Sequence, residues 1–137
     1  MFRAGDTFLI TDPDGGKQHL RIVLTAQSGS PPTVLTVQLN SATLLSDTTT
    51  VIEAGEHPFC IRRSVVSYDT MCVMEVGLLI EIEARTKLMP EPLFLRHQRC
   101  SPNLLERILQ GALASEMVAP IMRRELVKRL TVASGDP

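Results

Sequence analysis

Residues 19–39 have the sequence HLRIVLTAQSGSPPTVLTVQL, in which two apolar segments flank a loop rich in Gly, Ser and Pro. Leu20, Ile22 and Leu24 alternate with more polar residues in the first segment, and Leu35, Val37 and Leu39 alternate in the second. Such alternation is typical of strands with one face in a core. Two such strands on either side of a turn signal predict a β-hairpin.

The chain on both sides of the hairpin continues as short apolar segments separated by turns. Residues 12–16 (DPDGG) are a strong turn signal after the first apolar run. The other expected strands are residues 8–10, 51–53, 59–61 and 71–83. Strands this short and this closely spaced favour a small β-barrel.

The pattern changes to a helical period near residue 100. Ser101 and Pro102 provide a hydroxyl cap and a proline at the first helical position. Leucine and isoleucine then recur at helical spacing, which predicts a helix packed on the sheet. Pro120 begins a second expected helix. Its basic residues, expected on a solvated face, are Arg123, Arg124, Lys128 and Arg129.

Length and composition fit one domain with an aliphatic core. The chain has 137 residues, 44% of them hydrophobic and only 4% aromatic, and a chain of this size buries about two-thirds of its unfolded surface. We expect a mainly β fold with C-terminal α structure. The barrel would occupy residues 1–99 and the helical segment residues 100–132, with a frayed tail at residues 133–137.

Several features predict a cytoplasmic protein without membrane, metal or cofactor partners. No apolar run approaches the roughly 20 residues that span a bilayer, and the start lacks an apolar signal region. Cys60, Cys72 and Cys100 are odd in number and widely spaced, which favours free thiols, buried at the first two positions. The net charge of −1 argues against a broad basic face for nucleic acid but allows contact with a few nucleotides.

Short motifs spread over most of residues 5–113 form a recognisable series. In chain order they are Gly5-Asp6 before an apolar strand, LRIVLT at 20–25, the strand at 34–43 with its hydroxyl-rich end, Ser64-Val65-Val66, and the helix from Ser101. This series resembles the PemK/MazF-type toxin family. The resemblance implies an SH3-like or PemK-type β-barrel packed by one or two C-terminal helices.

The resemblance also implies a function and a site. Family members are mostly metal-independent endoribonucleases that cleave single-stranded RNA, act as homodimers and are neutralised by an antitoxin protein. Their catalytic Arg before Pro aligns with His19, with Leu20 in place of the Pro, and Arg21 lies on the same strand face. Their hydroxyl after the next strand aligns with Ser41, or with Thr43 if the turn is longer.

RNA cleavage without a metal needs a base for the 2′-hydroxyl, an acid for the leaving oxygen and a cation for the phosphoryl group. Histidine suits both proton transfers near neutral pH. His19 and His57 could converge at one rim of the barrel, with Arg21 or the pair Arg62-Arg63 as the cation. Alternatively, both histidines are turn residues that hydrogen-bond the backbone. His97 is expected in a solvated linker.

Further polar residues are candidates for contacts with substrate. They are Asn40, Thr43, Arg62, Arg63, Ser64 and Tyr68. Tyr68 could stack on a base, although a tyrosine that covers a barrel end with its hydroxyl in water is the more common arrangement. Ser64 lacks a nucleophile elbow, so a hydrogen-bonding role is favoured. Glu75, Glu81 and Glu83 are expected on a solvated strand face.

Two functions without catalysis remain open. The same barrel could bind a protein such as a topoisomerase subunit or an antitoxin, which the acidic balance and the missing Arg-Pro pair favour. The chain could also be a structural or regulatory component that docks through its second C-terminal helix.

Overall fold

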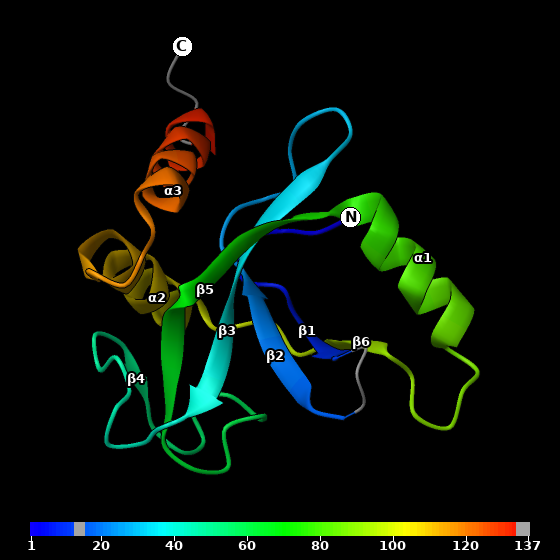
Figure 1. Ribbon diagram of the computed structural model, residues 1–137, viewed down its shortest axis with the longest axis horizontal. Helices are drawn as coiled ribbons and strands as arrows, with labels where there is room; N and C mark the ends of the chain where they lie inside the picture. The colour runs from blue at the N-terminus through cyan, green and yellow to red at the C-terminus, as the bar shows by residue number, and fades with distance from the viewer. Residues whose placement is uncertain (13–15, 134–137) are drawn as a thin grey trace.

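The computed structural model describes residues 1–12 and 16–133 and contains an antiparallel six-stranded sheet with three helices (Figure 1). The elements are β1 (Thr7–Thr11), β2 (Gln18–Val23), β3 (Thr33–Ser41), β4 (Val51–Ile52), β5 (Ser64–Glu75), α1 (Val76–Thr86), β6 (Phe94–His97), α2 (Pro102–Ala114) and α3 (Pro120–Ala133). The centre of the expected turn, residues 13–15, and most of the expected frayed tail, residues 134–137, lie outside the described residues.

The sheet has the strand order β4-β5-β3-β2-β1-β6 and curls into a half-barrel. The predicted hairpin is confirmed, because Leu20 pairs with Leu39 and Ile22 with Val37 between β2 and β3. β4 and β6 form opposite edges of the sheet and do not pair with each other. The sheet therefore has the curvature of a small barrel but stays open.

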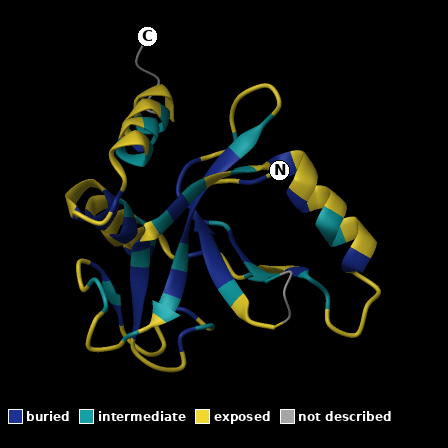
Figure 2. Cartoon of the chain, viewed as in Figure 1, coloured by how far each residue is buried: buried dark blue, intermediate teal, exposed yellow. Residues whose placement is uncertain are grey.

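Each face of the sheet carries its own apolar core, and the central strands are largely buried (Figure 2). The alternating leucines and isoleucines of the hairpin pack against α2 and α3, through residues such as Ile108 and Leu126. The opposite face packs against α1, where Val76 and Leu79 join a cluster with Phe8. The predicted start of α2 is confirmed, since the Ser101 hydroxyl accepts a hydrogen bond from the backbone N–H of Leu104.

Tyr68 fixes α2 to the sheet from inside the core. Its side chain is fully buried, and its hydroxyl donates to the carbonyl of Ile108 at 2.7 Å and meets the Thr50 hydroxyl at 2.7 Å. Burial raises the pKa of Tyr68 to about 12. The helix can approach this closely because Gly111 has no side chain at the contact.

The expected strand over residues 71–83 is wrong in its second half. β5 ends at Glu75, and α1 follows at once. Val76 and Leu79 are buried at helical spacing, whereas Leu78 and Ile80 are exposed. The apolar alternation was misleading because Val76 and Leu79, three residues apart, pack from a helix onto a cluster that contains Phe2, Phe8 and Phe94.

Three other local expectations also need correction. Residues 59–61 are not a strand, because Cys60 donates its N–H to the carbonyl of His57 in a tight turn. His97 is not in a linker but belongs to the unpredicted β6, which pairs with β1. Arg129 is not solvated, since its side chain is 9% exposed and donates hydrogen bonds to Thr33.

The contact at Gly111 predicts a large effect of a small substitution. A β-carbon there would overlap the hydroxyls of Thr50 and Tyr68, so Gly111→Ala should lower the free energy of unfolding by about 2–3 kcal/mol. The matched control is Gly77→Ala in α1, where a β-carbon meets nothing within 4 Å. The higher helix propensity of alanine should raise the free energy of unfolding of this variant by up to about 1 kcal/mol. Urea denaturation measures both; equal stabilities for the two variants would contradict this packing.

Candidate functional site

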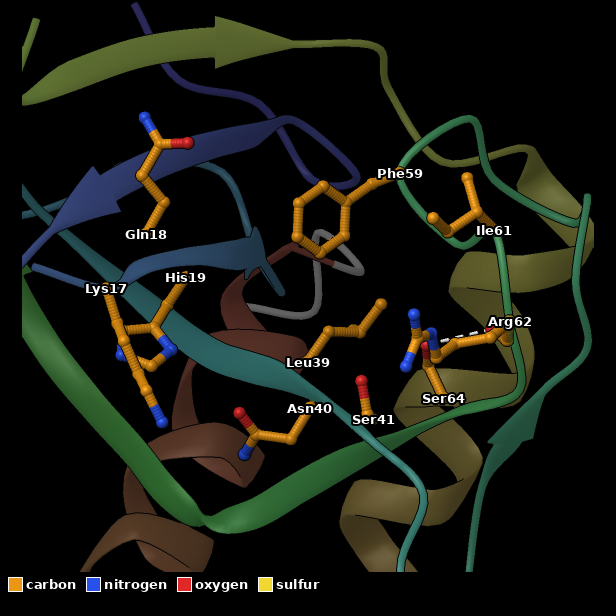
Figure 3. A pocket seen from close by; sticks show the side chains of 10 residues that line it. All are labelled: Lys17, Gln18, His19, Leu39, Asn40, Ser41, Phe59, Ile61, Arg62 and Ser64. Carbon is orange, nitrogen blue, oxygen red and sulfur yellow. Dashed lines mark hydrogen bonds between the residues drawn. The ribbon is translucent and has the colours of Figure 1, made fainter. Parts of the chain in front are cut away.

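An open hollow of about 530 Å³ lies where β2 begins and β3 ends (Figure 3). The residues predicted for the site that line it are His19, Asn40, Ser41, Arg62 and Ser64. Residues that were not predicted complete the lining: Lys17, Gln18, Leu39, Phe59 and Ile61. We call this feature the β2–β3 hollow.

His19 is the histidine of this hollow, and a carboxylate fixes its ring. Its Nε2 lies 3.1 Å from Oδ2 of Asp12, and its side chain is 20% exposed. If Nε2–H donates to the carboxylate, Nδ1 is left as an acceptor, and it has no hydrogen bond to any described residue. An imidazole oriented in this way can accept a proton from a bound hydroxyl group.

Polar groups from β3 and β5 form one side of the hollow. Asn40 accepts a hydrogen bond from the Gln38 amide at 3.0 Å and donates to Ser67 at 2.5 Å, so its side chain is held in place. Ser64 is buried and donates to the carbonyl of Arg62 at 3.2 Å. Ser41, at the end of β3, is exposed and free to contact a ligand.

Two cations give the hollow a local positive charge. Lys17 and Arg62 are exposed, and neither forms an ion pair with an acidic residue in the described part of the chain. The guanidinium of Arg62 points toward the middle of the hollow (Figure 3). Unpaired cations beside hydroxyl and amide groups suit an anion such as a phosphate.

Apolar side chains complete the site. The half-buried ring of Phe59 projects over the hollow above Leu39 (Figure 3), and Ile61 is 81% exposed at its rim. An aromatic face next to cations is the combination on which single-stranded nucleic acids stack their bases.

Arg21 lies on the same strand as His19 but does not line the hollow. Its residue exposure is 6%, and its guanidinium donates to the Thr36 hydroxyl at 2.9 Å, the Gln38 amide oxygen at 3.2 Å and the Thr70 carbonyl at 2.7 Å. Burial lowers the pKa of Arg21, and the neighbouring Cys72 opposes that shift. The predicted catalytic cation is therefore a structural cross-link between strands.

His57 does not line the hollow either. It is 2% exposed, its Nε2 donates to the carbonyl of Gln98 at 2.6 Å, and its Nδ1 accepts from the N–H of Phe59 at 3.1 Å. The centroid of the His97 ring lies 5.2 Å from the centroid of the His57 ring. Both ring nitrogens are thus occupied, which is the arrangement of a backbone-binding histidine rather than of an acid opposite His19.

The remaining predicted residues have partners outside the hollow. Tyr68 is buried in the core and cannot stack on a base. Thr43 shares hydrogen bonds with Ser46 in an exposed loop. Arg63, next to Arg62, forms an ion pair with Glu53 at 3.0 Å.

The missed residues gave weak sequence signals. Asp12 directly follows β1 and Lys17 directly precedes β2, so in the sequence they resemble ordinary solvated residues of a turn. Phe59 was assigned to a core strand because it precedes Cys60 and Ile61 in an apolar run. Only the fold shows that this run turns back over the end of β3.

Comparisons with known proteins leave the family open. No protein-family model matches the sequence, and no curated protein matches it significantly. Among the helices of residues 1–12 and 16–133, none is both long enough and apolar enough to cross a membrane.

Replacing Arg21 should test its structural role. Arg21→Lys keeps the charge but removes the planar donor geometry, so the free energy of unfolding should fall by at least about 2 kcal/mol. The matched control, Arg63→Lys, changes an exposed ion pair and should cost about 0–1 kcal/mol. Urea denaturation of both variants measures the difference, and equal losses would show that the buried guanidinium is dispensable.

The environment of His57 predicts a loss of stability in acid. Desolvation, aided by the nearby ring of His97, lowers the pKa of His57 below 6.5 in the folded chain. His57 is therefore protonated more readily in the unfolded chain than in the folded chain. As the pH falls below about 6.5, the free energy of unfolding should therefore decrease, by at most about 1.4 kcal/mol per pH unit. His57→Gln should reduce this slope in denaturation measured between pH 7.5 and 5.5; an unchanged slope would contradict the assignment.

Proposed function

We propose that the β2–β3 hollow binds single-stranded RNA and that the chain is a toxin-like, metal-independent endoribonuclease. The observation that carries this proposal is the combination of an Asp12-paired His19 with two cations, Lys17 and Arg62, that have no acidic partner among residues 1–12 and 16–133. A phosphodiester is the ligand that best uses both a proton acceptor and adjacent positive charge.

In the proposed reaction, each side chain of the hollow has a definite role. Lys17 and Arg62 hold the phosphate, and Phe59 stacks on a neighbouring base. His19 takes the 2′-hydroxyl proton at Nδ1 while the 2′-oxygen attacks phosphorus. The bond from phosphorus to the 5′-oxygen breaks, and water in the open hollow protonates that oxygen. The products are a 2′,3′-cyclic phosphate and a free 5′-hydroxyl.

The resemblance to PemK/MazF-type toxins supports the same proposal. The curled six-stranded sheet and the C-terminal helices are compatible with a PemK-type or SH3-like barrel. With this assignment we also propose a cytoplasmic homodimer that is neutralised by an antitoxin protein. Asn40, Ser41 and Ser64 would contact the RNA beside the cleaved bond.

A second function, a non-catalytic protein-binding module, is favoured by exposed apolar side chains in the loop after β3 and at the rim of the hollow. Leu44 and Leu45, in the loop after β3, are 104% and 96% exposed, and Ile61 is 81% exposed. Fully exposed adjacent leucines are characteristic of protein contacts rather than of RNA contacts. An antitoxin or a topoisomerase subunit would be a partner of this kind.

Cleavage of a long, end-labelled single-stranded RNA in EDTA distinguishes these functions. His19→Gln preserves an amide donor for Asp12 but cannot transfer a proton, so the cleavage rate should fall at least about 100-fold. The matched control, His97→Gln, changes a histidine outside the hollow and should cut at nearly the wild-type rate.

Three other results bear on the proposal. Equal cleavage by wild type and His19→Gln would overturn the role of His19. Absence of cleavage by the wild type would overturn the ribonuclease proposal and favour the protein-binding module. RNA binding that is unchanged in Arg62→Ala would remove the hollow as the phosphate site.

A further inference from the structure

A tight turn between β4 and β5 carries Phe59 over the β2–β3 hollow (Figure 3). Within residues 53–61, the N–H of Gly55 donates to the carbonyl of Cys60 at 2.9 Å, and the N–H of Cys60 donates to the carbonyl of His57 at 2.9 Å. These hydrogen bonds give the segment its shape but do not attach it to the sheet. We call residues 53–61 the Phe59 turn.

The side chain of His57 connects the Phe59 turn to Gln98, the residue after β6. The His57 Nε2 lies 2.6 Å from the Gln98 carbonyl oxygen, and its Nδ1 lies 3.1 Å from the backbone nitrogen of Phe59. The carbonyl can only accept a hydrogen bond, so Nε2 carries the hydrogen. The Phe59 N–H can only donate, so Nδ1 has none. The two hydrogen bonds together therefore require the neutral ring in one tautomer.

Protonation of His57 breaks one of these two hydrogen bonds. The added proton can only go to Nδ1, where it faces the N–H of Phe59. Two donors cannot share a hydrogen bond, so the ring and the backbone of Phe59 must separate. Because the ring is 2% exposed, the proton reaches Nδ1 when the turn opens, and it then prevents the turn from closing in the same way.

The carboxylates near the Phe59 turn already have cationic partners. Glu56, next to His57, pairs with Arg107 of α2, and Asp6 pairs with Arg99, the residue after Gln98. In the described chain no acidic residue lies within ion-pair distance of His57. A charged His57 ring therefore gains no ion pair that would hold it in place.

The two other titratable neighbours do not stabilise a charged ring either. Burial lowers the pKa of His57, and a charge on His97, whose ring centroid is 5.2 Å away, lowers it further, while the hydrogen bond to the Gln98 carbonyl opposes the shift. Burial raises the pKa of the Cys60 thiol, which is therefore uncharged near neutral pH. The closed turn thus favours neutral His57 through its charges as well as through its hydrogen bonds.

We propose that His57 is a pH-sensitive latch for the Phe59 turn. The neutral ring holds Phe59 over the β2–β3 hollow, and protonation at Nδ1 releases Phe59 while the sheet stays folded. A ligand of the hollow that contacts the Phe59 ring loses that contact in acid. The latch is a property of the turn, so it does not depend on the proposed ribonuclease activity.

NMR spectra of the full chain between pH 7.5 and 5.5 test the latch. At pH 7.5 the His57 ring nitrogens should show the neutral tautomer with its hydrogen on Nε2. The Phe59 amide should exchange at least about tenfold faster than the Ile22 amide in the centre of the sheet, and low concentrations of urea should accelerate only the exchange of Ile22. After correction for the intrinsic rate, Phe59 protection should fall by up to about tenfold per pH unit.

Three results in the wild-type chain would overturn the proposal, and they require no variant. One is a hydrogen on Nδ1 of His57 at pH 7.5. The second is a Phe59 protection that does not change with pH. The third is exchange of Phe59 and Ile22 at one rate with one dependence on urea, which would show that the turn opens only when the whole chain unfolds.

Two histidine variants separate the latch from a general effect of acid. His57→Gln keeps an amide donor for the Gln98 carbonyl but cannot titrate, so the pH dependence of Phe59 protection should disappear. The matched control, His97→Gln, keeps both hydrogen bonds of His57 and removes the neighbouring charge, so the dependence should persist with its midpoint at higher pH. An unchanged dependence in His57→Gln, or its loss in His97→Gln, would disprove the latch.

Discussion

The buried guanidinium of Arg21 is the constraint around which the sheet is organised. It starts from β2, contacts Thr36 and Gln38 of β3, and reaches the Thr70 carbonyl in β5. The β3–β5 register shifts between Thr36 and Gln38, at the place where the guanidinium lies. A charge buried with only neutral acceptors is tolerable when its hydrogen bonds are made. Three strands are therefore held in one arrangement.

This cross-link divides one face of the sheet into two regions with different roles. Toward Val23 and Val34 the face is apolar and covered by α1. Toward His19 and Asn40 it is polar and uncovered, and the turn that carries Phe59 bends over its end. We regard the open region as the candidate site because His19 and Asn40 are held by hydrogen bonds to neighbouring side chains, while Lys17 and Arg62 supply charge that no described residue neutralises.

The sequence was sufficient where local chemistry decides structure. The hairpin followed from alternation around a Gly/Pro loop, and the starts of α2 and α3 followed from Ser101-Pro102 and Pro120. It was insufficient where the local structure depends on packing between residues that are far apart in the sequence. The segment after Glu75 alternates like a strand but forms a helix that covers an aromatic cluster. His19 was predicted because histidine suits proton transfer and because the resemblance aligns it with the family's catalytic Arg, whereas its partner Asp12 and the ring of Phe59 depend on how the chain folds back.

Mapping the RNA contact directly would test the central claim that the β2–β3 hollow is the functional site. A short single-stranded RNA with 2′-O-methyl groups cannot be cleaved by attack of its own 2′-oxygen, so it can be titrated into labelled protein while amide and histidine-ring NMR signals are followed. The account predicts shifts concentrated at residues 17–19, 39–41 and 59–64, with the His19 ring among the most affected. Shifts confined to α1 or α3, or no shifts at saturating RNA, would contradict it.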